Sequence, residues 1–228
     1  MLNENKKIED LMVGGLKIIQ SDDLYKFTSD SVLLAKFPQK KFSKVLDLCA
    51  GSGVVGLHYL GEYGAEKVDF VEVQKPLADM CEESLKLNGL ADKCAVFNVN
   101  LKEFNGQGAY DAVFCNPPYK RTDSGYLPEN EHLAVCRAEV KCDFLDIVKC
   151  AYKALKHGGR FFACHKPERL TDVLTAMRTF EIEPTRLRFI AGKGKTDIYL
   201  FLIEGVKGKK PPFKVEGVFI NDAINFKG

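Results

Sequence analysis

The sequence predicts a single α/β domain with a mostly parallel, seven-stranded sheet and helices on both faces. Short apolar runs alternate with segments of helical periodicity over much of the chain. Such alternation requires parallel strands joined by crossover helices. A glycine-rich turn also follows the first apolar run of this series. The length of 228 residues suits one such domain better than two.

The N-terminal part is predicted to be a hairpin extension over residues 1–28. Gly14-Gly15 lies between short apolar runs in the segment 10–20, which is typical of a small hairpin. Ser29-Asp30 then precedes an apolar run, and these residue types cap helix starts. We therefore expect a short helix at this point, where a core over 29–206 begins.

The core contains seven predicted strands and their crossover helices. Helices are expected to end at Gly89 and at His157-Gly158-Gly159. Gly192-Lys193-Gly194-Lys195 predicts the turn of a closing antiparallel hairpin, ahead of a basic tail over 207–228. The predicted strands are 44–48, 67–73, 94–98, 110–115, 160–165, 182–191 and 196–206, and the helices are 53–60, 76–88, 143–156 and 168–180.

The composition excludes several classes of protein. No run approaches the ~18 apolar residues of a membrane span, and the first residues lack the apolar segment of a signal peptide. We expect a cytoplasmic protein. Its eight cysteines include no C-x-x-C pair and fall mostly in apolar stretches, so they are predicted to be reduced and buried. The four histidines show no metal-ligand spacing with them, and no metal is expected.

The charge is unevenly distributed. The net charge is only +2, yet the segment 184–214 holds eight basic residues against Asp197 and Glu204. A surface of this kind suits a phosphate-rich partner. A solvated edge hairpin is the alternative, because lysines also block edge pairing.

The glycine-rich turn predicts an adenosine site. Gly51-x-Gly53-x-x-Gly56 follows a strand and opens a helix, and Glu72 ends the next strand. Glycines allow a ligand to approach the backbone closely, and an acidic residue one strand away accepts hydrogen bonds from both ribose hydroxyls. This pattern alone does not choose between NAD and S-adenosylmethionine.

Asp47 favours S-adenosylmethionine. A carboxylate just ahead of the glycine turn would repel a pyrophosphate, whereas it suits the ammonium and sulfonium charges of that cofactor. The run from Asp47 to Gly53 resembles the first motif of Rossmann-like class I S-adenosylmethionine-dependent methyltransferases, with Cys49 at the first glycine. Asn100 follows the third strand, at the position where that superfamily commonly has an acidic residue that accepts a hydrogen bond from the adenine amino group. The amide oxygen of an asparagine can accept the same hydrogen bond.

Asn116-Pro117-Pro118-Tyr119 is the most informative motif. It follows a buried strand, and two prolines make a stiff loop at the rim of the sheet. The tetrapeptide resembles the motif by which amino-directed methyltransferases hold their target nitrogen. The resemblance implies that the Asn116 side-chain oxygen and the Pro117 carbonyl accept the two N–H bonds, while Tyr119 stacks on the ring.

Flanking segments narrow the resemblance. Several segments are similar to the bacterial tRNA(Val) adenine-37 N6-methyltransferase family, namely 15–20, 25–34, Cys136-Arg137-Ala138-Glu139, His157-Gly158-Gly159-Arg160-Phe161, His165-Lys166-Pro167 and 204–208. The resemblance implies a tRNA substrate and adenosine N6-methylation. The sequence gives no sign of an obligate protein partner, and none is expected. The resemblance also implies a cofactor site whose residues are Phe27, Thr28, Ser29, Asp30, Asp47, Ala50, Gly51, Gly53, Glu72, Asn100, Leu101 and Asn116.

The RNA is expected to bind beside this site. The polar loop 120–131 follows the tetrapeptide and is long enough to order on RNA binding. A partly unstacked anticodon-loop base is cheaper to flip than one in a duplex. Basic residues would then follow the RNA backbone: Lys120, Arg121, Arg186, Arg188, Lys193, Lys195, Lys207, Lys209 and Lys210.

Three alternatives stay open at the level of sequence. A release-factor glutamine methyltransferase shares the tetrapeptide, but such proteins usually carry a helical domain that the ~25 residues before Phe27 do not supply. The exocyclic amine could instead belong to ribosomal RNA or DNA. The third alternative is an RNA-binding module with a degenerate cofactor site, against which the intact tetrapeptide argues.

Overall fold

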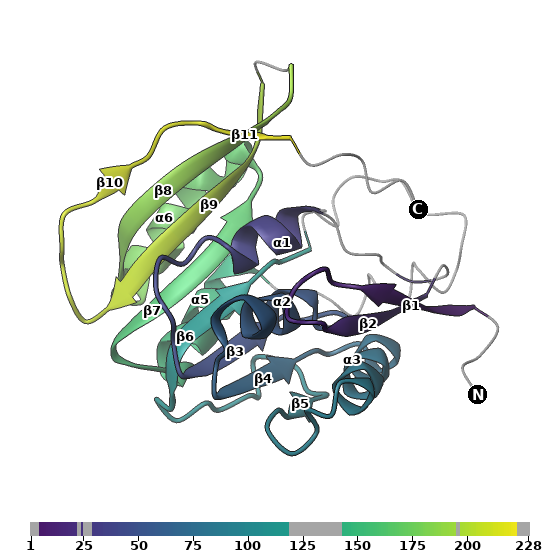
Figure 1. Ribbon diagram of the computed structural model, residues 1–228. Coiled ribbons are helices and arrows are strands. Elements are labelled where there is room, and N and C mark those ends of the chain that lie inside the picture. Colours follow the sequence, from purple (N-terminus) through teal and green to yellow (C-terminus); the bar gives the residue numbers. More distant parts are fainter. Residues whose placement is uncertain (1–4, 22–23, 25–28, 119–142, 195–196, 223–228) are drawn as a thin grey trace, which may run out of the picture.

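The computed structural model describes residues 5–21, 24, 29–118, 143–194 and 197–222, and it shows helices on both faces of a mixed sheet (Figure 1). A small antiparallel hairpin lies beside this sheet. The helices are α1 (Ser29–Ala35), α2 (Val54–Tyr63), α3 (Lys75–Leu87), α5 (Phe144–Ala154), α6 (Leu170–Thr179) and the 3₁₀ turn η1 (Pro167–Arg169). The strands are β1 (Lys6–Asp10), β2 (Lys17–Ser21), β3 (Lys44–Leu48), β4 (Lys67–Val71), β5 (Val96–Phe97), β6 (Tyr110–Cys115), β7 (Leu155–His165), β8 (Ile182–Gly192), β9 (Ile198–Lys207), β10 (Lys214–Val215) and β11 (Phe219–Asn221).

The main sheet has the order β10-β8-β9-β7-β6-β3-β4-β5, and β11 also pairs with β8. Strands β3 to β7 are parallel to their neighbours within this set, whereas β9 is antiparallel to both β7 and β8. The predicted parallel sheet with a closing antiparallel hairpin is therefore confirmed. All seven predicted strands are present, as β3 to β9.

Two apolar cores separate the layers. One core joins α1, α2 and α3 to one sheet face through side chains such as Leu34, Leu57 and Phe114. The other joins α5 and α6 to the opposite face through Ile147 and Met177. Burial on both faces explains why the central strands read as continuous apolar runs.

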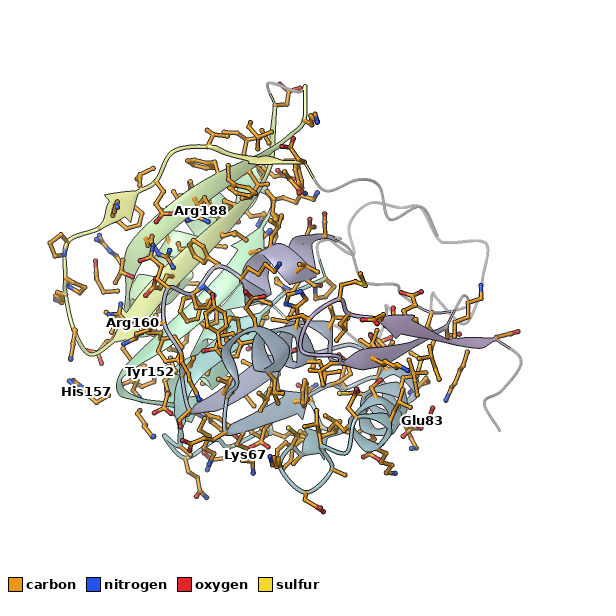
Figure 2. All side chains as sticks on the ribbon, viewed as in Figure 1. Lys67, Glu83, Tyr152, His157, Arg160 and Arg188 are labelled. Atoms are coloured by element: carbon orange, nitrogen blue, oxygen red, sulfur yellow. The ribbon has the colours of Figure 1, made fainter. Side chains whose placement is uncertain are left out.

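The N-terminal hairpin is longer than the segment 10–20 and is docked on α3. The Asn88 side chain accepts a hydrogen bond from the Lys17 backbone N–H (2.8 Å) and donates to its carbonyl (2.6 Å). Lys6 forms an ion pair at 2.7 Å with Glu83 of α3, which is labelled in Figure 2. These contacts hold the hairpin over the edge of the sheet where the glycine turn lies.

Some predicted boundaries were wrong. Helix α5 ends at Ala154, because Leu155 already pairs with Tyr110 of β6, and the expected turn at 157–159 is an irregularity within β7. Strand β5 has only two residues, and β4 ends at Val71. The tail over 207–228 contributes β10 and β11, which extend the sheet along β8 in parallel.

Candidate active site

The predicted site residues follow strands whose carboxyl ends share one edge, which we call the carboxyl edge. Leu48 of β3 lies opposite Val71 of β4 and Cys115 of β6, and Cys115 lies opposite Ala163 of β7. The glycine turn, Glu72 and Asn116 come directly after these positions. The register therefore brings both halves of the predicted site to the same end of the sheet (Figure 1).

The glycine turn depends on left-handed backbone conformations. Cys49, Gly51 and Gly53 have φ values of 56°, 58° and 92°. A Cβ atom at Gly53 would lie 2.6 Å from the Cys81 sulfur, whereas a Cβ at Gly51 would meet no atom within 4 Å. Gly53 is thus required by packing, and Gly51 presents its backbone to open space where a ligand fits.

Asp47 lies beneath this turn in β3 and is almost fully buried. Its Oδ2 accepts a hydrogen bond from the Gly56 N–H at 2.9 Å, while its Oδ1 has no partner among the described residues. Burial raises the pKa of this carboxyl to about 7, against the opposing effect of the Gly56 bond. An unpartnered buried oxygen of this kind would be stabilised as a carboxylate by a nearby cation.

Glu72 connects the glycine turn to the end of β4. Its two carboxylate oxygens accept hydrogen bonds from the N–H groups of Gly51 and Gln74, each at 2.9 Å. Burial raises the pKa of Glu72, and these two backbone bonds oppose that effect. The Ala50 N–H donates to the Val71 carbonyl at 3.1 Å, so the predicted neighbours are brought together.

The structure gives less direct support for the predicted cofactor residues after the third strand of the core, Asn100 and Leu101. The Asn100 side-chain oxygen accepts a hydrogen bond from the Lys102 N–H at 3.0 Å, which is the geometry of a local turn. Leu101 is buried in the core shared with α5. Neighbouring Asn98 instead donates to the carbonyls of Glu72 and Val73, at 2.9 and 3.0 Å. Contact between Asn100 and the cofactor stays a prediction.

The Asn116 amide is held from two sides at the end of β6. Its Nδ2 donates to the Ser31 hydroxyl oxygen at 2.9 Å, and its Oδ1 accepts from the Cys164 thiol at 3.1 Å. Pro117 is buried, whereas Pro118 is exposed. The side chain of Asn116 is thus oriented before any substrate is bound.

Helix α1 and the N-terminal hairpin supply residues that the sequence did not single out. Gln20 of β2 donates a hydrogen bond from its amide to the Ser52 hydroxyl in the glycine turn, and both residues are buried. Ser31 contacts Asn116 from α1, where Ser29 and the buried Asp30 also lie. In the sequence, Gln20 belongs to the segment 15–20 that resembles the family, but nothing there gives it a contact with the glycine turn.

The predicted RNA-binding residues that the structure describes do not form one surface. Arg186 was a wrong prediction, since it is 6% exposed and its guanidinium is bonded to Glu204 at 2.8 Å and to the Phe37 carbonyl at 2.8 Å. Arg188 is paired with Glu216 of the tail. The ammonium of Lys207 donates to the carbonyls of Tyr152 (2.6 Å) and Leu155 (2.8 Å), so it too is engaged inside the fold.

The remaining described lysines of this set lie at opposite ends of the sheet. Lys193 is exposed at the carboxyl edge, because β8 runs parallel to β7 and ends just before it. Lys209 and Lys210 are exposed beyond the end of β9, which runs the other way. This opposite end, the amino edge, carries Tyr152 and His157 at the lower left of Figure 2.

Several predicted residues lie outside the described part of the chain. They are Phe27, Thr28, Tyr119, Lys120, Arg121, Lys195 and the loop 120–131. Within the described residues, no group of three or more His, Cys, Asp or Glu side chains is arranged to hold a metal ion. No helix among them is long and apolar enough to cross a membrane.

A comparison with protein families decides the assignment. The profile of the methyltransferase small domain matches residues 27–170, which is more than half of the chain. The chain belongs to this methyltransferase family. The family assignment agrees with the resemblance found in the motifs from Asp47 to Gly53 and from Asn116 to Tyr119.

Relatives of this methyltransferase act on different substrates. It is 25% identical over 207 residues to a tRNA1(Val) (adenine(37)-N6)-methyltransferase of Flavobacterium johnsoniae, covering 88% of this chain and 86% of the relative. It is 30% identical over 108 residues to a ribosomal protein uL3 glutamine methyltransferase of Bordetella pertussis, covering 46% of this chain and 36% of the relative. The second likeness therefore spans only about a third of that relative.

Solved structures confirm the class I methyltransferase fold. A predicted O-methyltransferase from Agrobacterium tumefaciens has a TM-score of 0.66 at 18% identity, covering 84% of this chain and 86% of its own. The TYW2 protein of P. horikoshii, in complex with MeSAdo, has a TM-score of 0.61 at 15% identity, covering 92% of this methyltransferase and 74% of its own chain.

Proposed function

We propose that this methyltransferase transfers a methyl group from S-adenosylmethionine to the N6 atom of an adenosine in tRNA, at position 37 of the anticodon loop. The observation that carries the proposal is the oriented Asn116 amide at the carboxyl edge, beside the glycine turn and followed by a diproline corner. The likeness to the Flavobacterium tRNA methyltransferase over most of both chains supports the choice of substrate.

The described residues fit S-adenosylmethionine. Gly51 leaves open space above its backbone, and Glu72 lies within hydrogen-bonding distance of the same turn. A cationic ligand near the unpartnered Asp47 oxygen under the turn would stabilise the ionised form of this carboxyl, and the resulting carboxylate would in turn favour the ligand. When bound, the cofactor supplies an electrophilic methyl group.

The diproline corner accounts for activation of the amine. An exocyclic aromatic amine is a poor nucleophile because its lone pair is delocalised into the ring. The Asn116 oxygen and the Pro117 carbonyl would accept hydrogen bonds from the two N–H groups of this amine. These two bonds favour a pyramidal nitrogen whose lone pair is directed at the methyl group. Positioning of this kind contributes several kcal/mol to catalysis, on the order of 7 or more in favourable cases, without requiring a titrating base first.

A second candidate function is methylation of a glutamine side chain in a protein, such as ribosomal protein uL3 or a release factor. A glutamine carboxamide presents the same planar NH₂ group, and the Bordetella relative is 30% identical over its matched segment. The tRNA substrate is favoured because the tRNA methyltransferase relative is matched over 86% of its length and the glutamine methyltransferase over 36%.

The test is incubation of the full chain with labelled S-adenosylmethionine and either bulk tRNA or ribosomal protein and release factor. We expect label in tRNA, recovered as N6-methyladenosine after nucleoside digestion. Asn116→Ala should abolish transfer while cofactor affinity, measured by calorimetry, stays within about twofold. Label confined to protein glutamine would contradict the tRNA proposal, and full activity of Asn116→Ala would remove Asn116 from the mechanism.

A further inference from the structure

The contact between Asn116 and Ser31 joins segments that are 85 residues apart in the chain. Ser31 is 5% exposed and lies on α1, whose Leu34 and Ala35 are fully buried against the sheet. Cys164, on the other side of the amide, is fully buried in β7. The Asn116 side chain is therefore hydrogen-bonded to both α1 and β7, and the apolar core holds these two elements in place.

The structure holds the amide in one orientation, with Nδ2 donating to the Ser31 hydroxyl at 2.9 Å, which directs Oδ1 away from α1. A hydroxyl is a good hydrogen-bond partner for an amide, whereas a thiol is only a weak donor and a weak acceptor. The bond to Ser31 therefore contributes more than the contact with Cys164 to keeping the amide in this orientation. An amide oxygen has two lone pairs, so its bond with Cys164 is compatible with acceptance of a second N–H.

We infer that Ser31 is a positioning residue, which holds the Asn116 amide with its oxygen presented to the amine of the substrate. This inference rests on the proposed function only in requiring a target NH₂ group, and it applies equally to adenine and to glutamine. Without the hydroxyl, the amide would gain a rotated state in which NH₂ faces the substrate amine and repels it. Transfer would then slow although the cofactor site is intact.

The kinetic test compares Ser31→Ala and Ser31→Thr in the full chain. We expect Ser31→Ala to lower the rate of methyl transfer at saturating substrates up to about 100-fold, with the Kd for S-adenosylmethionine unchanged. Ser31→Thr retains the hydroxyl and should restore most of the rate. Equal losses in both variants, or a parental rate in Ser31→Ala, would overturn the inference.

Ser84→Ala is the matched control. Ser84 is also fully buried, and its hydroxyl accepts from the Ile19 N–H at 2.9 Å and donates to the Met80 carbonyl at 2.8 Å. Its loss should lower stability as Ser31→Ala does. It should leave the transfer rate within about twofold of the parent, because distant sites without shared partners act independently and the hydrogen bonds of Ser84 run to Ile19 and Met80. A similar rate loss in Ser84→Ala would assign the Ser31 effect to general destabilisation and overturn the inference.

A second measurement separates this inference from the choice of substrate. In protein labelled with ¹⁵N-asparagine, the side-chain NH₂ signal of Asn116 is identified by its loss in Asn116→Ala. We expect the two NH₂ protons of Asn116 to be widely separated in shift in the parent and in Ser31→Thr, and to converge in Ser31→Ala. Unchanged signals in Ser31→Ala would overturn the inference, whatever substrate the methyltransferase proves to use.

Discussion

Asp47 is the residue whose ionisation distinguishes this site from an ordinary strand end. Burial raises its pKa from 3.8 to about 7, so between these values the folded protein binds a proton that the unfolded chain has lost. The free energy of unfolding should therefore fall as pH rises through this window, by at most about 4 kcal/mol.

Urea unfolding of the cofactor-free protein between pH 4.5 and pH 7.5 measures this dependence. We expect Asp47→Asn, which has no titrating proton, to flatten the profile, while Asp92→Asn on the exposed surface leaves it as in the parent. Parallel profiles for the parent and Asp47→Asn would show that Asp47 is ionised in the folded protein throughout.

Cys49 is a non-glycine residue in a left-handed conformation, with φ of 56°, at the position where the superfamily motif has its first glycine. Such a conformation costs a side-chain-bearing residue about 1 kcal/mol or more. We expect Cys49→Gly to leave the free energy of unfolding unchanged or to raise it by up to about 1 kcal/mol, because relief of strain offsets the greater chain entropy of glycine.

Ala50→Gly is the control, because residue 50 is the next residue and has no positive φ. This substitution should lower the free energy of unfolding by up to about 1 kcal/mol. Urea unfolding under reducing conditions measures both variants. A loss in Cys49→Gly as large as that in Ala50→Gly would show that Cys49 is unstrained.

At the scale of elements, the tail is held to β8 by Glu216. Its carboxylate pairs with Arg188 and, at 3.4 Å, with Arg186, and its N–H donates to the Leu187 carbonyl at 2.8 Å. Beyond it, β11 ends at Asn221, whose amide donates to the Tyr199 hydroxyl at 2.8 Å and to the Ser29 hydroxyl at 3.4 Å. The tail therefore runs from the amino edge to the start of α1 at the carboxyl edge.

Glu216→Gln should weaken this attachment. Burial tends to raise the pKa of Glu216, but the hydrogen bond from Arg188 and the two arginine charges outweigh it and lower the pKa. Its stabilising contribution is thus present at neutral pH and lost as pH falls through the lowered value. We expect the protection factor of the residue 216 amide against hydrogen exchange to fall several-fold in the variant at neutral pH, and in the parent when pH is lowered through the pKa of Glu216. Glu183→Gln, whose partner Arg178 is exposed, is the control. Unchanged exchange would mean that backbone pairing alone holds the tail.

At the scale of the whole molecule, the distribution of charge decides how an RNA substrate approaches. The basic C-terminal quarter of the sequence is divided between buried ion pairs, the amino edge and the carboxyl edge. Of its exposed described lysines, Lys193 shares the carboxyl edge with Asn116, while Lys209 and Lys210 lie at the amino edge. Lys214 lies on β10, opposite Arg186 of β8.

On the proposal of a tRNA substrate, Lys193→Glu should weaken tRNA binding more than the double variant Lys209→Glu/Lys210→Glu, although it reverses fewer charges. The difference should be larger at low than at high salt, because phosphate contacts are screened. Fluorescence titration with tRNA at two salt concentrations measures it. A greater loss in the double variant would indicate that the RNA reaches around the sheet to the amino edge.

The sequence by itself determined the layered α/β fold, the glycine turn, the acidic residues that bracket it and the motif that follows β6. These features are local, since periodicity and turn residues act over a few positions, and parallel order follows from the strand-helix alternation. Only the tertiary structure decided which distant groups meet. Ser31 and Cys164 reach Asn116 because α1 packs against the sheet and β7 lies beside β6, and Arg186 is withdrawn from the surface by carboxylates on β9 and the tail. Such pairings depend on register and packing across the whole chain, which no short segment encodes.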